Sequence, residues 1–259
     1  MTIWYDTTSR ARHSVQISAP RRVSLLDDLS TRLRDGKGFS VATLNLDHVV
    51  KLRHDADFRA AYEAQTHVTA DGNPIVWLSR LAGQREVSLV PGSELISPVA
   101  ALAAEQGVPI GLFGATEASL TAAATALREQ TPGLVISHVN APPMRFDPDG
   151  PAADAAISAI GESGARVVFL ALGAPKQERF AARAQKALPN VGFLSIGAGL
   201  DFVSGAQTRA PKLVRVLAAE WLWRMLSDPG RLAARYGACL MVLPGLTARA
   251  WAMGRKGRA

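Results

Sequence analysis

The stretch Arg166–Arg179 (RVVFLALGAPKQER) constrains the fold of this chain more than any other. Its residues Val167–Leu172 form a short and continuous apolar run, which is typical of a strand buried on both faces. Gly173 breaks the run, Pro175 suits a first helical turn, and apolar residues recur at helical spacing from Lys176 onward. The stretch therefore predicts a strand, a tight glycine turn and a helix, in that order.

The same alternation continues through most of the chain. Strands are predicted at 39–46, 66–73, 108–114, 134–139, 167–172 and 191–196, with one further short strand at 15–18. Helices are predicted at 20–34, 47–65, 74–81, 93–106, 116–130, 151–163 and from 176 onward. Strands that alternate with helices predict an α/β fold with a Rossmann-like, doubly wound, mostly parallel sheet.

Composition narrows the class of protein. Of the 259 residues, 48% are hydrophobic and 20% are charged, so the chain can bury a substantial core. The single cysteine, Cys239, excludes an internal disulfide framework and a zinc site built on cysteines. We find neither an apolar signal segment near the N-terminus nor a run of about 20 apolar residues, so a cytoplasmic location is expected.

The C-terminal part differs in charge from the rest. From Ala206 onward, the sequence has ten Lys and Arg residues but only two acidic residues, Glu220 and Asp228. This part therefore has a net charge of +8, and the preceding part has −1, because the whole chain has +7. We therefore divide the chain into an α/β core, residues 1–205, and a helical basic appendage, residues 206–259, with one helix predicted at 212–228 and a second after Pro229. Basic appendages meet nucleic acid, anionic lipid or phosphorylated ligands. The apolar face of this one either packs on the core or lies in a membrane interface.

Polar residues next to the predicted strand ends are candidates for a site, because ligands bind beyond the carboxyl ends of parallel strands. Asp71 could act as a general base there, or it could shape an Asx turn with Gly72. Thr43 and Asn45 alternate along one strand, so they are predicted to share a face, where they line a site or satisfy a loop. Lys176, Gln177 and Glu178 are predicted to lie at this edge beside backbone N–H groups that favour an anion, although an ordinary turn with solvated charges fits equally.

Metal and dinucleotide motifs are weak or missing. Asp55-Ala56-Asp57 imitates a metal-binding DxD string, but it falls inside the predicted helix 47–65 and is interpreted as a solvated face. The sequence has no GxGxxG after its first convincing strand and no phosphate-binding P-loop. We therefore expect no metal and no cofactor. Glycine turns follow several strands, each a weak signal alone, namely Gly114, Gly173, Gly197 and Gly199.

Taken together, these stretches resemble the WecG/TagA/CpsF glycosyltransferases from about residue 40 to about residue 236. The matching pieces are TLNLDHV at Thr43–Val49, ADGNPIVW at Ala70–Trp77, GLFGAT at Gly111–Thr116, LGAPKQE at Leu172–Glu178, and the Arg- and Trp-containing pattern of Arg209–Tyr236. The resemblance implies an inverting, metal-independent transferase that moves a sugar from a UDP-sugar to a polyprenyl-diphosphate-linked saccharide. It also implies a peripheral location on the inner face of the cell membrane and a role in exopolysaccharide, O-antigen or similar polysaccharide synthesis.

The resemblance also implies roles for individual residues. Asp71 matches the family's general base, Thr43 and Asn45 match residues at the base of the site, and Gln177 matches a polar residue of the nucleotide-sugar pocket. The four glycine turns are expected to line the same pocket. The appendage, which in the family closes over the site and touches the membrane, is matched by Arg209, Arg224, Arg231 and Arg235.

One position departs from the family pattern. Leu89 stands where the family often has an arginine, and Arg85 lies nearby but is shifted in sequence. The sequence leaves open whether Arg85 replaces the missing arginine, which sugars are the donor and the acceptor, and whether the protein forms a homo-oligomer.

Two rival functions come from other classes. A nucleotide-binding module with a basic nucleic-acid-binding tail predicts salt-dependent affinity for RNA or DNA and no need for Asp71. A Rossmann dehydrogenase is disfavoured by the missing GxGxxG. The resemblance favours the transferase, with an anionic membrane surface rather than nucleic acid as its partner.

Overall fold

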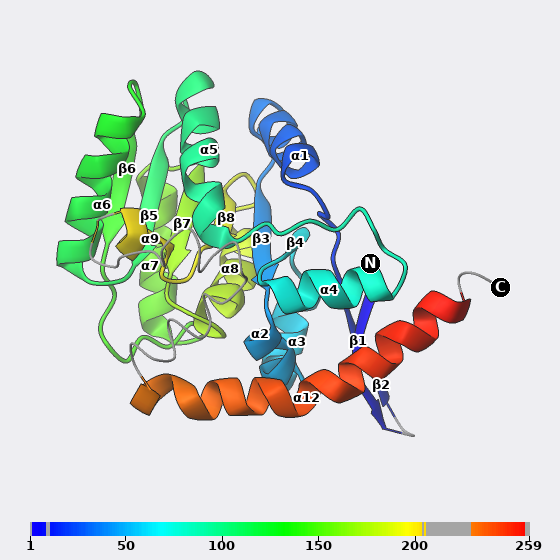
Figure 1. Ribbon diagram of the computed structural model, residues 1–259. Coiled ribbons are helices and arrows are strands. Elements are labelled where there is room, and N and C mark those ends of the chain that lie inside the picture. The colour runs from blue at the N-terminus through cyan, green and yellow to red at the C-terminus, as the bar shows by residue number, and fades with distance from the viewer. Residues whose placement is uncertain (1, 9–10, 204, 206–228, 257–259) are drawn as a thin grey trace.

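The computed structural model describes residues 2–8, 11–203, 205 and 229–256 of the chain. Its centre is a six-stranded sheet in the order β4-β3-β8-β7-β5-β6 (Figure 1). All pairings in this sheet are parallel. The strands are β3 (Phe39–Leu44), β4 (His67–Ala70), β5 (Ile110–Gly114), β6 (Ile136–Asn140), β7 (Val167–Ala171) and β8 (Gly192–Ser195). The predicted doubly wound α/β fold is confirmed.

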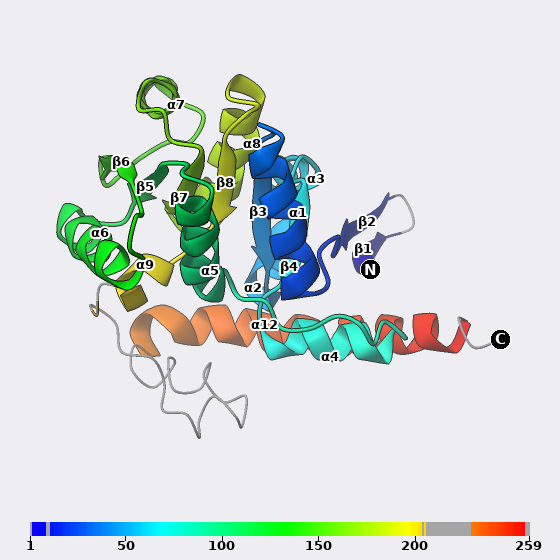
Figure 2. The same cartoon turned by 90° about the horizontal axis from the view of Figure 1, so that it is seen from above.

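Helices cover both faces of the sheet (Figure 2). One face carries α1 (Arg22–Arg34), α5 (Gly92–Glu105) and α6 (Glu117–Gln130), and the other carries α2 (Leu46–Leu52), α3 (Ala56–Glu63), α7 (Pro151–Glu162) and α8 (Lys176–Ala187). In β7, Val167 and Phe169 pack into the cluster below α5 and α6, whereas Val168 and Leu170 pack against α7 and α8. Burial on both faces explains why this strand is a continuous apolar run.

Aromatic packing fixes α8 behind the end of β7. The rings of Phe113 and Phe180 stack with centroids 4.8 Å apart, and Phe146 and Phe193 meet Phe180 edge-on. Both Phe113 and Phe180 are fully buried. Offset and edge-to-face ring pairs add specific attraction to the area that they bury. The first turn of α8 is therefore held rigidly at the carboxyl edge of the sheet.

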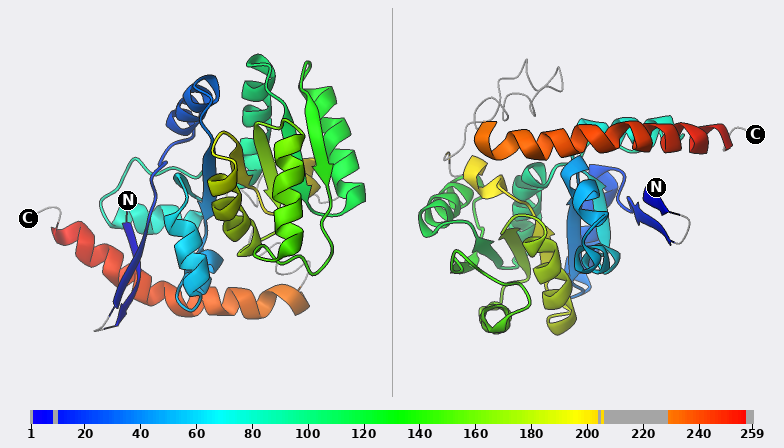
Figure 3. Two further views of the ribbon diagram at one scale, coloured as in Figure 1. Left: turned by 180° about the vertical axis from the view of Figure 1, so that it is seen from behind. Right: turned by 90° about the horizontal axis from the view of Figure 1, so that it is seen from below.

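The long helix α12 (Pro229–Lys256) crosses the edge where β3 and β4 end, alongside α4 (Asn73–Leu81) (Figures 1 and 3). Leu246 and Ala250 of α12 are buried in the same cluster as Ile75 and Leu78 of α4. The helix predicted after Pro229 is confirmed, and it continues through Pro244. Because this helix shares a cluster with the core, the division into residues 1–205 and 206–259 stays a prediction.

The described helices include none that combines the length and the apolar character needed to cross a bilayer. A short helix, α9 (Gly199–Val203), follows β8 and was not expected from the sequence. The helix expected at 212–228 lies outside the described residues.

Two sequence predictions are wrong in detail. The helix predicted at 47–65 is two helices, α2 and α3, because Asp55 caps α3 by accepting a hydrogen bond of 2.9 Å from the Phe58 N–H. The weakly patterned N-terminus forms an antiparallel hairpin of β1 (Thr2–Thr8) and β2 (Ala11–Gln16), where only one short strand at 15–18 was predicted.

Candidate active site

The candidate site lies at the carboxyl edge of the sheet, around the ends of β3, β4 and β8. Asp71 follows β4, and its backbone N–H donates to the carbonyl of Leu44 at the end of β3 with a distance of 2.7 Å. Gly72 then turns the chain into α4 with φ of +104°. A left-handed backbone of this kind favours glycine. Asp71 is partly exposed and therefore reachable from this edge.

Asn45 has a different position from the one predicted. Strand β3 ends at Leu44, and Asn45 is the N-cap of α2, where its Oδ1 accepts a hydrogen bond of 3.0 Å from the His48 N–H. Asn45 is therefore not part of the strand as predicted, although its backbone is still extended directly after Leu44. The error has a local cause, since a capping Asn next to a strand end looks like another strand residue in sequence.

Thr43 is buried inside the edge. Its side-chain methyl packs next to Gly92 at the start of α5, where a Cβ would lie 3.3 Å from that methyl and 2.9 Å from the carbonyl oxygen of Ser195. Only a glycine allows α5 to approach β3 and β8 this closely. Thr43 therefore helps to position the start of α5 against two strands.

Helix α2 carries two side chains whose importance the sequence did not indicate. Lys51 forms an ion pair of 2.8 Å with Asp47 and also donates to the carbonyl of Ala174, 3.1 Å away. Asp47 in turn binds Arg235 of α12 at 3.2 Å. This chain of contacts connects the turn before α8, the helix after β3 and the C-terminal helix.

A buried polar pair joins α2 and α3. The Nδ1 of His48 and the hydroxyl of Tyr62 share a hydrogen bond of 2.7 Å. Burial lowers the pKa of His48 to about 3, so its ring is neutral at pH 7. Burial and the charges of Glu178 and Asp71 raise the pKa of Tyr62 well above its usual value. Asp71 and Glu178 therefore lie close enough to Tyr62 for their charges to act on its phenol.

The first turn of α8 brings two buried polar residues to the edge. The amide Nε2 of Gln177 donates to Oε1 of Glu178 over 2.8 Å, and its Oε1 accepts from the N–H of Gly197 over 3.0 Å. Gln177 is only 2% exposed and Glu178 is fully buried. Burial raises the pKa of Glu178 to about 7, against the opposing effects of Gln177 and Lys51. The sequence placed both residues at this edge, but it did not indicate that the carboxyl of Glu178 is buried.

The four predicted glycines have different surroundings. A Cβ on Gly114 would lie 2.5 Å from the backbone of Ala171, and one on Gly199 would lie 2.8 Å from a methyl of Ile96, so both serve close packing. Gly173 and Gly197 have positive φ and open space around a hypothetical Cβ. The structure therefore leaves these last two as the better candidates for contact with a ligand.

The structure describes only some of the arginines that the resemblance assigns to the site. Arg235 is paired with Asp47. Arg209 and Arg224 lie outside the described residues, as does the side chain of Arg231. Arg85 is exposed on the loop between α4 and α5, and Leu89 of the same loop is 39% exposed.

The DxD-like residues have partners of their own. Asp55 caps α3, and Asp57 forms an ion pair of 3.3 Å with Arg179 of α8. Within the described part of the chain, no group of three or more His, Cys, Asp or Glu side chains has the arrangement of a metal site. Asp55 and Asp57 therefore act as a helix cap and an interhelical contact.

A match to a family model decides the class of the protein. The model described as "Glycosyl transferase WecG/TagA/CpsF family" matches residues 12–258. The chain belongs to this family. As a WecG/TagA/CpsF glycosyltransferase, it takes part in cell-surface polysaccharide synthesis and acts on a sugar donor and an acceptor. The edge around Asp71, Gln177 and Gly197 is the part of the fold where ligands bind in doubly wound sheets.

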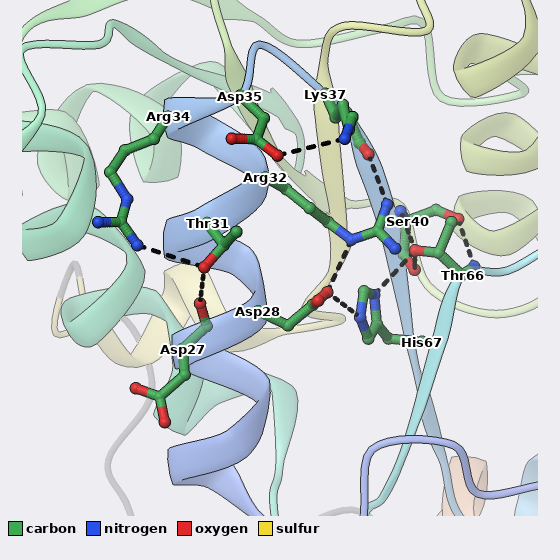
Figure 4. A network of polar contacts seen from close by, with 11 residues as sticks. Asp27, Asp28, Thr31, Arg32, Arg34, Asp35, Lys37, Ser40, Thr66 and His67 are labelled. Atoms are coloured by element: carbon green, nitrogen blue, oxygen red, sulfur yellow. Dashed lines mark hydrogen bonds and ion pairs between the residues drawn. The ribbon is translucent and has the colours of Figure 1, made fainter.

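A second polar cluster lies at the opposite, amino edge of the sheet (Figure 4). The Nε2 of His67 binds Asp28 at 2.8 Å, its Nδ1 lies 2.8 Å from the Thr66 hydroxyl, and Arg32 binds the same Asp28 oxygen at 2.7 Å. Thr66 also donates to the carbonyl of Ser40. Burial lowers the pKa of His67 despite the neighbouring carboxylate. These contacts fasten α1 to the first residues of β3 and β4, far from the carboxyl edge.

Proposed function

We propose that this glycosyltransferase is inverting and metal-independent, and that it moves a sugar from a UDP-sugar to a polyprenyl-diphosphate-linked saccharide. The observation that carries the proposal is the family match over residues 12–258 together with Asp71 at the carboxyl edge of the sheet. The reaction takes place at the cytoplasmic face of the membrane in the synthesis of an exopolysaccharide, an O-antigen or a similar polymer.

Asp71 acts as the general base in this proposal. Its carboxylate removes the proton from the acceptor hydroxyl as the oxygen attacks the anomeric carbon from the face opposite UDP. The bond from that carbon to the diphosphate oxygen breaks with inversion, and the electron pair leaves on UDP. A single positioned base is typically worth about 10²–10⁴-fold in rate. Support comes from the partial exposure of Asp71 and from its fixed backbone bond to Leu44.

The leaving diphosphate needs positive partners. Helices α4, α5 and α8 begin at or near this edge, and none of them has a side-chain cap hydrogen bond among the described residues. Backbone N–H groups at such helix starts, together with the helix dipole, attract anions. We propose that they act with the appendage arginines Arg209, Arg224 and Arg231 on the developing charge.

The C-terminal helix docks on anionic lipid in this proposal. Apolar side chains on its surface are exposed, among them Leu240, Met241 (83%) and Trp251 (52%). Two of them, Leu240 and Trp251, line an open groove of about 690 Å³ between α4 and α12 together with Leu81 and Leu243. The Arg255 guanidinium lies 4.8 Å from the centre of the Trp251 ring. An apolar surface next to basic residues suits a membrane interface.

Membrane docking is tested by sedimentation with vesicles that contain phosphatidylglycerol. We expect Met241→Ser combined with Trp251→Ser to release most of the protein from the vesicles. The control is Met144→Ser, which changes a fully exposed methionine on a loop away from α12 and should leave binding unchanged. Equal sedimentation of all three proteins would show that this surface does not dock.

The transferase activity is tested by incubating the protein with a panel of UDP-sugars and a short-chain polyprenyl-diphosphate saccharide. We expect UDP release that depends on the acceptor, and a product whose anomeric configuration, determined by NMR, is opposite to that of the donor. Retention of configuration, or the absence of transfer from every UDP-sugar, would contradict the proposal. Salt-dependent binding of RNA or DNA without transfer would favour the nucleic-acid-binding alternative.

A further inference from the structure

Glu178 is an unusual residue to find in the interior. Its side chain is fully buried in the first turn of α8, and its Oε2 has no hydrogen-bond partner among the described residues. Burial of a carboxyl group is costly unless a partner compensates it. The side chain that the structure gives this carboxyl as a partner is the Gln177 amide, 2.8 Å from Oε1, and the backbone N–H of Glu178 itself is a further donor. A costly group of this kind indicates a role that an apolar side chain could not fill.

The orientation of the Gln177 amide follows from its two partners. A backbone N–H can only donate, so the amide oxygen of Gln177 must face Gly197. The amide NH₂ must then face Glu178, which offers it an acceptor. With an apolar residue at position 178, the amide would lose one of the two partners that fix this orientation. Glu178 thus helps to hold the neighbouring side chain in place.

Gly197 begins the turn that closes the candidate site next to β8. The turn has a left-handed residue at Gly197 (φ +56°), and its Gly199 packs against Ile96 and Ser93 of α5. Gln177 holds the turn from the side of α8, opposite to α5. A shift of this turn would change the shape of the edge between β7 and β8.

We propose that Glu178 is a positioning residue that acts through Gln177 to hold the Gly197 turn in the shape that binds the sugar-nucleotide donor. The inference rests on the proposed function, because it assigns the donor to this edge. Gln177 is then a support of the pocket wall, consistent with its nearly complete burial. Glu178 does not touch the donor, and its effect is on donor binding more than on the chemical step.

The charge state of Glu178 gives the proposal a distinctive readout. A hydrogen bond to a carboxylate is stronger than one to a neutral carboxyl. Lys51 of α2 acts on the carboxyl of Glu178, and Glu178 acts on Tyr62 of α3. Tyr62 is also affected by the charge of Asp71 after β4 and is hydrogen-bonded to His48 of α2. Because the pKa of Glu178 is raised to about 7, its carboxylate becomes protonated as the pH falls through neutrality, and the hydrogen bond from the Gln177 amide weakens. His48 stays neutral and Tyr62 stays protonated over that range.

The first test is kinetic and uses the full-length enzyme. We expect Glu178→Ala to raise the KM for the UDP-sugar by about 10-fold with a smaller change in kcat. Glu178→Gln keeps an acceptor oxygen but cannot titrate, so it should restore a low KM and abolish the rise in KM that the wild type shows below pH 7. The control is Glu63→Gln on the exposed side of α3, which should keep the wild-type pH profile. An unchanged KM in Glu178→Ala, or a wild-type pH profile in Glu178→Gln, would overturn the proposal.

A second test does not depend on catalysis. Hydrogen exchange of the backbone amides at 197–199 should be about 10-fold faster in Glu178→Ala than in the wild type, whereas exchange in β5 should not change. Glu178→Gln serves as the second comparison if Glu178→Ala does not fold: the protection of its amides at 197–199 should be the same at pH 6 and at pH 8, whereas protection in the wild type should fall at pH 6. Unchanged exchange at 197–199 would overturn the positioning role. Transfer that fails in the wild type as well would instead contradict the proposed function.

Discussion

The Nε of Arg235 in α12 lies 3.2 Å from Oδ1 of Asp47 in α2, and this ion pair connects the C-terminal helix to the edge of the sheet. Asp47 also binds Lys51 at 2.8 Å, and Lys51 reaches the carbonyl of Ala174 just before α8. One carboxylate therefore joins three segments that are far apart in sequence. The arrangement gives Arg235 a structural partner in addition to the substrate role expected from the resemblance.

The Arg235–Asp47 pair is tested by a double-mutant cycle. Arg235→Gln and Asp47→Asn should show a coupling of about 0.2–1 kcal/mol in urea unfolding, because the arginine is 43% exposed and solvent screens the pair. Arg255→Gln removes the same charge from the other end of α12 and should show no coupling with Asp47→Asn. Equal coupling for both arginines would mean that only the overall charge of α12 matters.

Burial of neutral His48 makes stability depend on pH. Its pKa is lowered to about 3 in the folded state, whereas the unfolded chain takes up this proton near pH 6.5. Its contribution to stability is therefore present above pH 6.5 and is lost as the pH falls toward 3. Between pH 7 and pH 5 the loss should be about 2 kcal/mol in the free energy of unfolding.

The pKa of His67 is also lowered, so His67 contributes to the pH dependence of stability in the same direction. A variant of His48 is therefore needed to separate the two contributions. His48→Gln should be less stable than the wild type at pH 7, through loss of the bond to Tyr62, but should lose less stability between pH 7 and pH 5. His54→Gln removes an exposed histidine and should keep the wild-type slope. If the free energy of unfolding changed with pH equally in the wild type and in His48→Gln, the role given to His48 would be contradicted.

The crossing of α12 over α4 depends on one glycine. A Cβ on Gly254 would lie 2.3 Å from the carbonyl oxygen of Leu81, so Gly254→Ala must push the helices apart. We expect a loss of about 1–3 kcal/mol in stability. Gly237→Ala in the same helix has no atom within 4 Å of the new Cβ and should stabilise the helix by up to about 1 kcal/mol. Thermal unfolding of the two variants should shift in opposite directions.

Metal independence is tested at the DxD-like residues. Asp55→Ala should cost about 0.5–2 kcal/mol of stability through loss of the α3 cap, and Asp55→Asn should cost less because Asn can still cap. We expect both variants, and the wild type in excess EDTA, to keep wild-type transferase activity per folded molecule. Activity that is lost in EDTA and restored by Mg²⁺ or Mn²⁺ would contradict a metal-independent reaction.

The parts of the fold that follow from short-range patterns were predictable. The run Val167–Ala171 is apolar because it is buried on both faces, and the helix predicted from residue 116 begins where Thr116 caps α6 by accepting from the Ser119 N–H. The parts that depend on contacts between distant segments were not. Glu178 follows a turn and looks solvated, yet packing of α3 with Tyr62 and Gln65 buries it.

Local capping produced the other errors. Asn45 lies between β3 and α2, and Asp55 lies between α2 and α3, where each caps the helix that follows. In the sequence, each of them continues the pattern of its neighbours. The bond between His48 of α2 and Tyr62 of α3 joins two helices that the sequence pattern had merged into one, so it could not be predicted. Asp71 was indicated by its position after a strand and by the resemblance, but its backbone bond to Leu44 depends on the sheet.

The central claim is that Asp71 at the carboxyl edge of the sheet removes the acceptor proton. The most direct measurement is the turnover of Asp71→Asn with saturating UDP-sugar and lipid-linked acceptor, next to UDP affinity and thermal unfolding, with Asp35→Asn on the opposite edge as the control. We predict that Asp71→Asn binds UDP and unfolds like the wild type but turns over about 10²–10⁴-fold more slowly. Turnover close to that of the wild type would contradict the account.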